Sequence, residues 1–194
     1  AARSEAIRAV VEADKEAVDE RSRGIEALTG EAKAELEAVM PEFKAAVRAV
    51  ERLDKKDIQE IKSFQSPPPL VALVMECVCT LLGQKTDWAA AKNLLADTSF
   101  LRRLKEFDKD AMPEKVVTRL KGYVRLKDFD PAQVEKQSHA ARSLCVWCRA
   151  LCTYDDIAKD VEPKRKRLLE MEAELAKAQE QLLLKQGELD EVQA

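Results

Sequence analysis

The chain has 194 residues, of which 36% are charged, and its formal net charge at pH 7 is only −3. It contains five glycines and is rich in Ala, Glu, Lys, Leu and Arg, a composition typical of long helices and not of a β-sheet. The longest uncharged stretch, residues 63–75, is short and contains three prolines, which excludes a membrane-spanning helix there. Because the sequence begins and ends within a helical pattern, we expect it to be a piece of a larger protein.

Residues 1–65 are predicted to form a first long helix. Apolar residues recur along it in steps of three and four, and such steps keep one stripe facing a partner helix. The stripe consists of Leu28, Ala32, Leu36, Val39, Phe43, Ala46, Val50 and Leu53. Pro41 interrupts the pattern and is expected to bend or locally open the helix.

The spacing of this stripe changes after Leu53, since the next large apolar residues are Ile58 and Ile61. One interpretation is that the coiled coil ends here and the chain enters a globular segment. The other is a seam that permits two alignments of the helices, because heptad interruptions change the local winding. The sequence leaves both interpretations open.

Residues 66–152 are too apolar to be a linker and are predicted to fold into a head of about six short helices. We expect helices over residues 70–82, 86–97, 99–107 and 113–122, a brief one from residue 130, and a sixth from about residue 138. Prolines start several of them, Thr86 caps the second, and Gly83 ends the first. The predicted core comprises Phe64, Val74, Val78, Trp88, Leu94, Phe100, Leu104, Val117, Leu120, Leu144 and Trp147.

Residues 153–194 are predicted to form a second long helix that pairs with the first. Its seam is Leu168, Met171, Leu175, Ala178, Leu182, Lys185, Leu189 and Val192. The stretch from Lys164 to the end spans roughly 46 Å, at about 1.5 Å per residue. That length matches the first helix only from about residue 34 onward, so residues 1–33 are expected to lack a partner within the chain.

The predicted fold is therefore all-α: an antiparallel two-helix coiled-coil stalk capped by a small globular bundle. Pro67, Pro68 and Pro163 are expected at the junction of stalk and head.

Charge is distributed unevenly along the chain. Residues 67–152 hold 14 Lys or Arg against 10 Asp or Glu, while the two arms together carry a net charge of −7. Within the head, residues 100–127 carry a net charge of +5. A basic head on acidic arms favours an acidic partner for the head. The alternative is that these charges only solvate helix surfaces.

The cysteines and the single histidine do not predict catalysis. The five cysteines are Cys77, Cys79, Cys145, Cys148 and Cys152. Their odd number, without the spacing of a disulfide framework or a signal peptide, indicates a reduced intracellular setting. Cysteine can act as a small apolar residue between two buried helices, and a zinc site is the weaker alternative because zinc-binding pairs usually sit on turns. His139 is expected on the surface or at a helix cap. We predict no catalytic residue, no metal and no cofactor.

Several stretches together resemble the stalk and microtubule-binding domain of the dynein heavy chain, over roughly four-fifths of the sequence. They are residues 57–64 leading into Ser66-Pro67-Pro68, then Leu81-Leu82-Gly83, Thr86-Asp87-Trp88, Trp147, Tyr154 and Val161-Glu162-Pro163. Residues 62–68 and 107–110 are more similar to axonemal than to cytoplasmic dyneins. The short connection from Asp97 to Phe100 leaves no room for the flap insertion of some axonemal dyneins.

This resemblance implies that the head binds the groove between α- and β-tubulin through its first, third and sixth helices and adjoining loops. The implied tubulin-binding residues are Arg102, Arg103, Lys105, Arg119, Lys121, Arg125, Lys136 and Arg142. Ala72 stands where cytoplasmic relatives place a lysine, so the contribution of the first helix is in question.

The resemblance also implies a partner within the same polypeptide, the ring of AAA+ modules of the dynein heavy chain. ATP turnover in that ring would slide one stalk helix against the other and change the affinity for tubulin. The implied location is the cytoskeleton of the cytoplasm, in the axoneme of a cilium or flagellum, with no membrane or nucleic acid as partner. Three other readings stay open: a coiled-coil scaffold that only dimerises, an RNA-binding helical arm, and a metal or redox enzyme.

Overall fold

The computed structural model describes residues 2–194, which form eight helices and contain no strand. Their contacts divide the chain into two compact units. Residues 2–36 with residues 159–194 make the first unit, here called the paired arm, and Glu37–Ala158 makes the second, here called the bundle. Two long helices, α1 (Ala2–Glu51) and α8 (His139–Gln193), contribute residues to both units.

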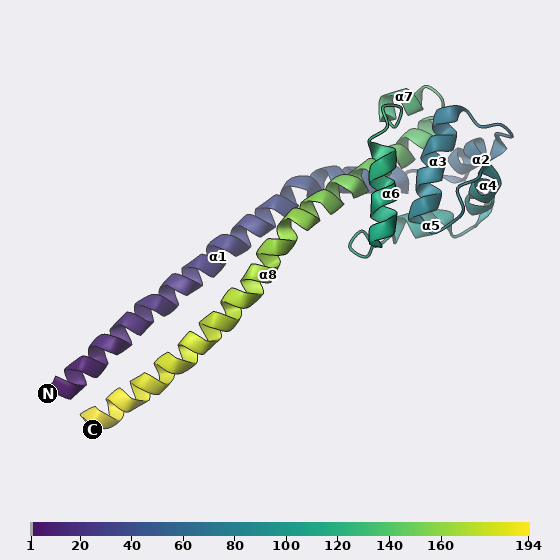
Figure 1. Cartoon of the computed structure of the whole chain (residues 1–194). Coiled ribbons are helices and arrows are strands. Elements are labelled where there is room, and N and C mark those ends of the chain that lie inside the picture. Colours follow the sequence, from purple (N-terminus) through teal and green to yellow (C-terminus); the bar gives the residue numbers. More distant parts are fainter. Residues whose placement is uncertain (1) are drawn as a thin grey trace. The chain divides into compact units, whose positions relative to one another are not determined.

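In the paired arm, the first part of α1 runs antiparallel to the last part of α8 (Figure 1). Polar contacts join the two helices along the seam: Lys185 Nζ lies 2.6 Å from Asp14 Oδ2, and Lys164 binds Glu35. Met171 packs at Gly24, where an added Cβ would lie 3.3 Å from Cε of the methionine. The seam therefore mixes apolar and charged contacts.

Residues 1–33 were expected to lack a partner, and this prediction is wrong for residues 2–33, the part that the structure describes. Val11 is buried at 3% exposure, and both Asp14 and Glu31 contact lysines of α8. The error arose because α1 ends at Glu51 and not at residue 65, while the last long helix begins as early as His139. The residues of α1 that pair with the last part of α8 therefore lie nearer the N-terminus than the sequence predicted.

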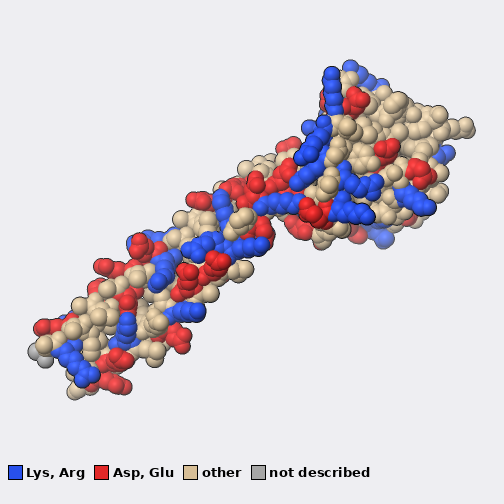
Figure 2. All heavy atoms as spheres, in the orientation of Figure 1, with Lys and Arg blue, Asp and Glu red and all other residues tan. Residues whose placement is uncertain are grey.

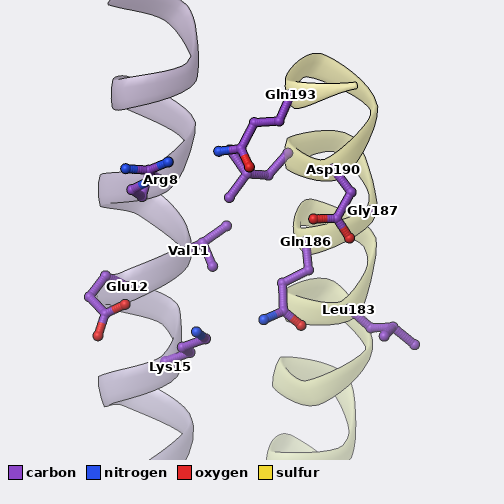
Figure 3. Close-up of a pocket in the computed structure, with 10 residues that line it drawn as sticks. Arg8, Val11, Glu12, Lys15, Leu183, Gln186, Gly187, Asp190 and Gln193 are labelled. Carbon is purple, nitrogen blue, oxygen red and sulfur yellow. The ribbon is translucent and has the colours of Figure 1, made fainter.

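A cleft borders the seam beside Val11, which is itself buried. The cleft has a volume of about 560 Å³, and Arg8, Glu12 and Lys15 line it from α1. Figure 3 shows the Val11 side chain pointing toward α8, whereas Leu183 points away from α1. Gly187 adds no side chain, so this end of the seam is loosely packed.

The bundle contains the short helices and the segments of α1 and α8 nearest to them in sequence. The short helices are α2 (Lys55–Ser63), α3 (Pro69–Leu81), α4 (Trp88–Ala96), α5 (Phe100–Lys105), α6 (Glu114–Val124) and α7 (Pro131–Glu135). Helix α3 packs against α4, α6 and α7, and α4 in turn contacts α2 and α5 (Figure 1). Every cysteine is buried, and Trp147, Phe100 and Phe129 are the largest fully buried side chains.

The change of spacing after Leu53 coincides with a break in the helix. The main chain leaves α1 after Glu51, and Asp54 starts α2 with a capping box: its side chain accepts from the Lys56 and Asp57 N–H groups. Asp57 reciprocates by accepting from the Asp54 N–H at 2.9 Å. The hydrogen bonds that the Asp54 carboxylate accepts from these N–H groups lower its pKa, because they stabilise the charged form. The change of spacing therefore marks a break between two helices, where a single helix over residues 1–65 was predicted.

Some predicted boundaries are shifted. Asp87 and not Thr86 caps α4, and α6 continues through Gly122 to Val124. Pro41 and Pro163 both lie inside long helices, so neither marks a helix end.

Two side chains hold loops in place by hydrogen bonds to main-chain carbonyl groups. The Trp88 indole N–H donates to the Phe64 carbonyl at 2.9 Å, which holds the turn between α2 and α3. Arg149 Nη1 donates to the Phe129 carbonyl at 2.9 Å, and this bond holds the loop after α6 against α8. Neither contact could be predicted from sequence spacing.

Candidate functional site

Two segments that carry Lys and Arg residues contact helix α3, one at each of its ends. At its start, the Leu70 N–H donates to Gln137 Oε1 at 2.9 Å, which brings in the junction of α7 and α8. Just past its end, the Leu82 carbonyl accepts from Arg103 Nη2 of α5 at 3.1 Å. Gly83 follows with a φ of +73°, a left-handed conformation that favours glycine and ends the helix. The ends of a 13-residue helix lie about 20 Å apart.

The first cation group lies near the end of α3. Arg103 is half-buried and, besides its bond to Leu82, lies 4.0 Å from Asp97. Arg119 of α6 is exposed and lines a shallow hollow with the segment after Gly83. Arg102 and Lys105 of α5 are exposed, and the ion pair of Arg102 with Glu106 is a long one, at 4.0 Å. Arg102, Lys105 and Arg119 are therefore available to a partner, while Arg103 is engaged within the fold.

The second cation group lies at the start of α3. Arg142 Nε is 3.5 Å from Glu135, and Lys136 contacts Gln133 at 3.3 Å. His139 is exposed and faces the same Glu135 carboxylate, which agrees with its prediction as a surface residue. Lys136 is exposed and Arg142 is half-exposed, and the acidic Glu135 neighbours Arg142 and His139.

Lys121 does not join either group. Its Nζ lies 3.0 Å from Asp156 and 3.6 Å from Asp155 on α8, and its side chain is only 25% exposed. Residues two apart on a helix point in nearly opposite directions, so Lys121 turns toward α8 while Arg119 turns away. Arg125, just after α6, is exposed. Lys121 is thus better described as a fold-stabilising residue than as a free cation.

Lys and Arg side chains gather over α6 and α7 on the face shown in Figure 2, whereas both signs alternate along the paired arm. The two hollows that Arg119 lines are shallow and open, unlike an enclosed small-molecule site. A broad, open, cationic surface suits an extended acidic partner.

All five cysteines are buried, and Cys77 of α3 contacts Cys148 of α8, as expected from their spacing. Burial raises the pKa of Cys145 to about 12 and that of Cys79 to about 11, and it also raises the pKa of Cys148. Thiols in such surroundings stay protonated and unreactive. Among residues 2–194, no group of three or more His, Cys, Asp or Glu side chains is placed to hold a metal ion. No helix in the same range is both long and apolar enough to cross a membrane.

Comparison with known proteins decides the family. A family model described as the microtubule-binding stalk of the dynein motor matches residues 3–194. The chain belongs to this family of dynein stalks. A solved structure of the microtubule-binding domain of dynein-c is similar, with a TM-score of 0.60 and 36% sequence identity, over 71% of this chain and 97% of that one.

Several curated relatives of this dynein stalk are axonemal heavy chains. Human dynein axonemal heavy chain 14 is 40% identical over 94% of the chain, and human dynein axonemal heavy chain 6 is 44% identical over 72%. The chain spans only 5% and 4% of the length of these two relatives. The matched family describes a stalk that binds microtubules and not a catalytic domain.

One constellation in this dynein stalk was missed by sequence reasoning. Lys109 Nζ lies 5.6 Å from the centre of the Phe43 ring and 5.0 Å from that of Tyr154, and the two ring centres are 5.6 Å apart. The Tyr154 hydroxyl donates to Asp110 Oδ1 at 2.6 Å. We call Phe43, Lys109, Asp110 and Tyr154 the aromatic clamp. Phe43 had been assigned to the coiled-coil seam, and no spacing rule connects it to Lys109.

Proposed function

We propose that this chain binds microtubules through the bundle, at the groove between α- and β-tubulin. Family membership is the observation that carries the proposal, and the exposed cations support it. Arg102, Lys105, Arg119 and Arg125 would make the strongest contributions, because none of them is held tightly within the fold. Lys136 and Arg142 would add a second contact region, and Arg103 would act mainly by holding α5 against α3.

Long-range attraction to the acidic surface of tubulin explains why the cations are concentrated in the bundle. Oppositely charged surfaces raise the rate of encounter and fix the orientation of the complex more than they raise the final affinity. Ala72 on α3 is uncharged, so α5 and α6 would replace the cation that cytoplasmic relatives carry on that helix.

We also propose that the rest of a dynein heavy chain, with its ring of AAA+ modules, controls this affinity by sliding α1 against α8. The parent protein would be the ATPase, and this part would need no cofactor. The loosely packed seam of the paired arm supports the proposal. In addition, Lys164 contacts both Glu35 and Glu31, which lie one helical turn apart, so its ion pair would survive a four-residue shift. The axoneme of a cilium or flagellum is the proposed location, since the curated relatives are axonemal.

A second candidate function is a scaffold that associates through its coiled coil. Leu169, Leu183 and Leu184 favour it, because their exposed fractions are 68%, 70% and 65%. Light scattering separates the two functions: the scaffold predicts a dimer that ignores microtubules, and the stalk predicts cosedimentation with them.

The direct test is cosedimentation of the chain with microtubules at several salt concentrations. The double variant Arg102→Glu with Arg119→Glu is expected to bind at least about tenfold more weakly, since reversed charges would face an acidic surface. Its affinity should also depend less on salt, because fewer attractive contacts remain to be screened. Circular dichroism should show an unchanged fold.

The matched control is Lys55→Glu with Lys56→Glu, two exposed residues at the start of α2 with the same total change of charge. An equal loss of affinity in both variants would show that net charge alone matters. No loss in the first variant would remove α5 and α6 from the tubulin-binding surface.

A further inference from the structure

The aromatic clamp joins three separate parts of the bundle. Phe43 belongs to α1, Tyr154 to α8, and Lys109 and Asp110 to the segment between α5 and α6. Tyr154 is 7% exposed, so the contact is anchored on a buried ring. The Lys109 side chain is 27% exposed, and its ammonium group also lies 3.5 Å from Asp110. A partly desolvated cation over two rings is a stronger contact than a cation over one exposed ring.

The clamped segment is held at a second point and is short. Phe107 packs edge-on against Trp147, with ring centres 5.3 Å apart, and the Asp110 N–H donates to Asp108 Oδ1 at 3.0 Å. Residues 106–113 lead directly from α5, which carries Arg102, into α6, which carries Arg119. Any displacement of the clamp would therefore be passed to both of these cation-bearing helices.

The clamp can form in only one alignment of α1 with α8. A slide of one helical turn, four residues or about 6 Å, would move Phe43 away from Tyr154 and bring a neighbour into its place. The residues one turn to either side are Val39 and Val47, and neither has a ring. In either direction, a shift would replace one of the two aromatic partners of Lys109, the Phe43 ring, by a valine.

We infer that the aromatic clamp is a positioning device that transmits the alignment of α1 and α8 to the cation-bearing helices α5 and α6. The inference rests on the proposed function, which supplies the microtubule and the sliding of the helices. With the clamp closed, residues 106–113 hold α5 and α6 against α1 and α8. With the helices shifted by one turn, the segment loses its contact with α1 and the two helices are released.

The test fixes the alignment by cross-linking. Lys164 lies between two carboxylates one turn apart, so Lys164→Cys combined with Glu35→Cys traps the observed alignment, and Lys164→Cys combined with Glu31→Cys traps the shifted one. Each pair is closed as a direct disulfide, which requires the two Cα atoms to lie within about 7 Å and therefore tells apart alignments one helical turn away from each other. The native cysteines are all buried and should not compete.

Lys109→Gln is then added to each cross-linked protein, and the Kd for microtubules is measured by cosedimentation. In the observed alignment, removal of the cation is expected to change the Kd by about two- to fivefold, the size of a partly buried cation–π contact. In the shifted alignment only the Tyr154 ring remains beside Lys109, so the change of Kd, corrected for the lost charge, should be clearly smaller. Lys44→Gln, an exposed lysine beside Phe43, measures that charge effect in both alignments. Equal effects of Lys109→Gln in the two alignments would overturn the inference.

A second measurement does not depend on microtubules. Hydrogen exchange of the amides in residues 106–113 should be about tenfold faster in the shifted alignment, because the clamp that protects them is open. If protection is the same in both alignments, a local distortion at Pro41 has absorbed the shift and the inference is wrong. If protection differs but neither protein binds microtubules, the clamp stands and the proposed function fails.

Discussion

The bundle and the paired arm share two helices but bury their apolar residues to different degrees. In the bundle, aromatic and aliphatic side chains form a continuous buried core around Trp147, Phe100 and Phe129. In the paired arm, few residues are buried, among them Val11 and Ala32, and the other seam positions are partly exposed. The bundle is thus specified by complementary packing, while the arm relies more on charged pairs such as Lys185 with Asp14 and Lys164 with Glu35.

This contrast predicts that one substitution in the bundle core has a larger effect than any in the arm. Trp147→Ala should lower the free energy of unfolding by about 3–5 kcal/mol, since a large cavity would remain. Urea denaturation followed by the fluorescence of Trp88 measures it. Leu183→Ala is the control in the arm and should stay within about 0.5 kcal/mol of the wild type. A comparable loss in both would mean that the arm is packed as tightly as the bundle.

Removal of the Arg149 guanidinium sharpens the description of the bundle. Arg149→Met keeps most of the side-chain volume but leaves the carbonyls of Phe129 and Val124 without their donor. The expected loss is about 1–3 kcal/mol, the cost of an unsatisfied polar group. Arg48→Met, at an exposed position of α1, should have little effect in the same urea titration. If the two variants are equally stable, water replaces the arginine at no cost.

Replacement of glycines by alanine tests how tightly the arm is packed. Gly30→Ala should stabilise the arm by about 0.5–1 kcal/mol, because alanine favours the helix and no atom lies within 4 Å of the new methyl group. Gly24→Ala should have the same sign but a smaller size, since the flexible Met171 side chain must move aside. Hydrogen exchange of arm amides gives both values. Destabilisation by Gly24→Ala would show a tighter seam than the one described.

The smallest expected effect concerns pH. A hydrogen bond to Glu35 raises the pKa of Lys164 above its ordinary value of 10.5. A raised pKa contributes stability that is fully present below 10.5 and is lost as the pH rises through the higher folded value. The melting temperature of the wild type should therefore fall more than that of Lys164→Gln when the pH is raised above 10.5. If the melting temperatures of the two proteins fall equally with pH, the ion pair of Lys164 with Glu35 does not stabilise the arm.

The sequence predicted helices α3 to α7 and most of the core, because apolar spacing and prolines report directly on local structure, but it included α2 in the first long helix. It placed Phe64 and Trp88 in the core, where both are only partly buried. It mispaired the arm because the end of α1 depends on the Asp54 capping box, which looked like a continuation of the helix. It also missed the aromatic clamp, since Lys109 meets Phe43 only through the tertiary fold. The eight predicted tubulin-binding residues stay a prediction, with Lys121 turned toward α8.

The hydrogen bond from Trp88 to the Phe64 carbonyl has a practical consequence. Because this bond fixes the indole, Trp88 is an intrinsic fluorescent probe of the turn between α2 and α3. Emission from Trp88 in a Trp147→Phe background would report a rearrangement of this turn in real time, without any attached dye.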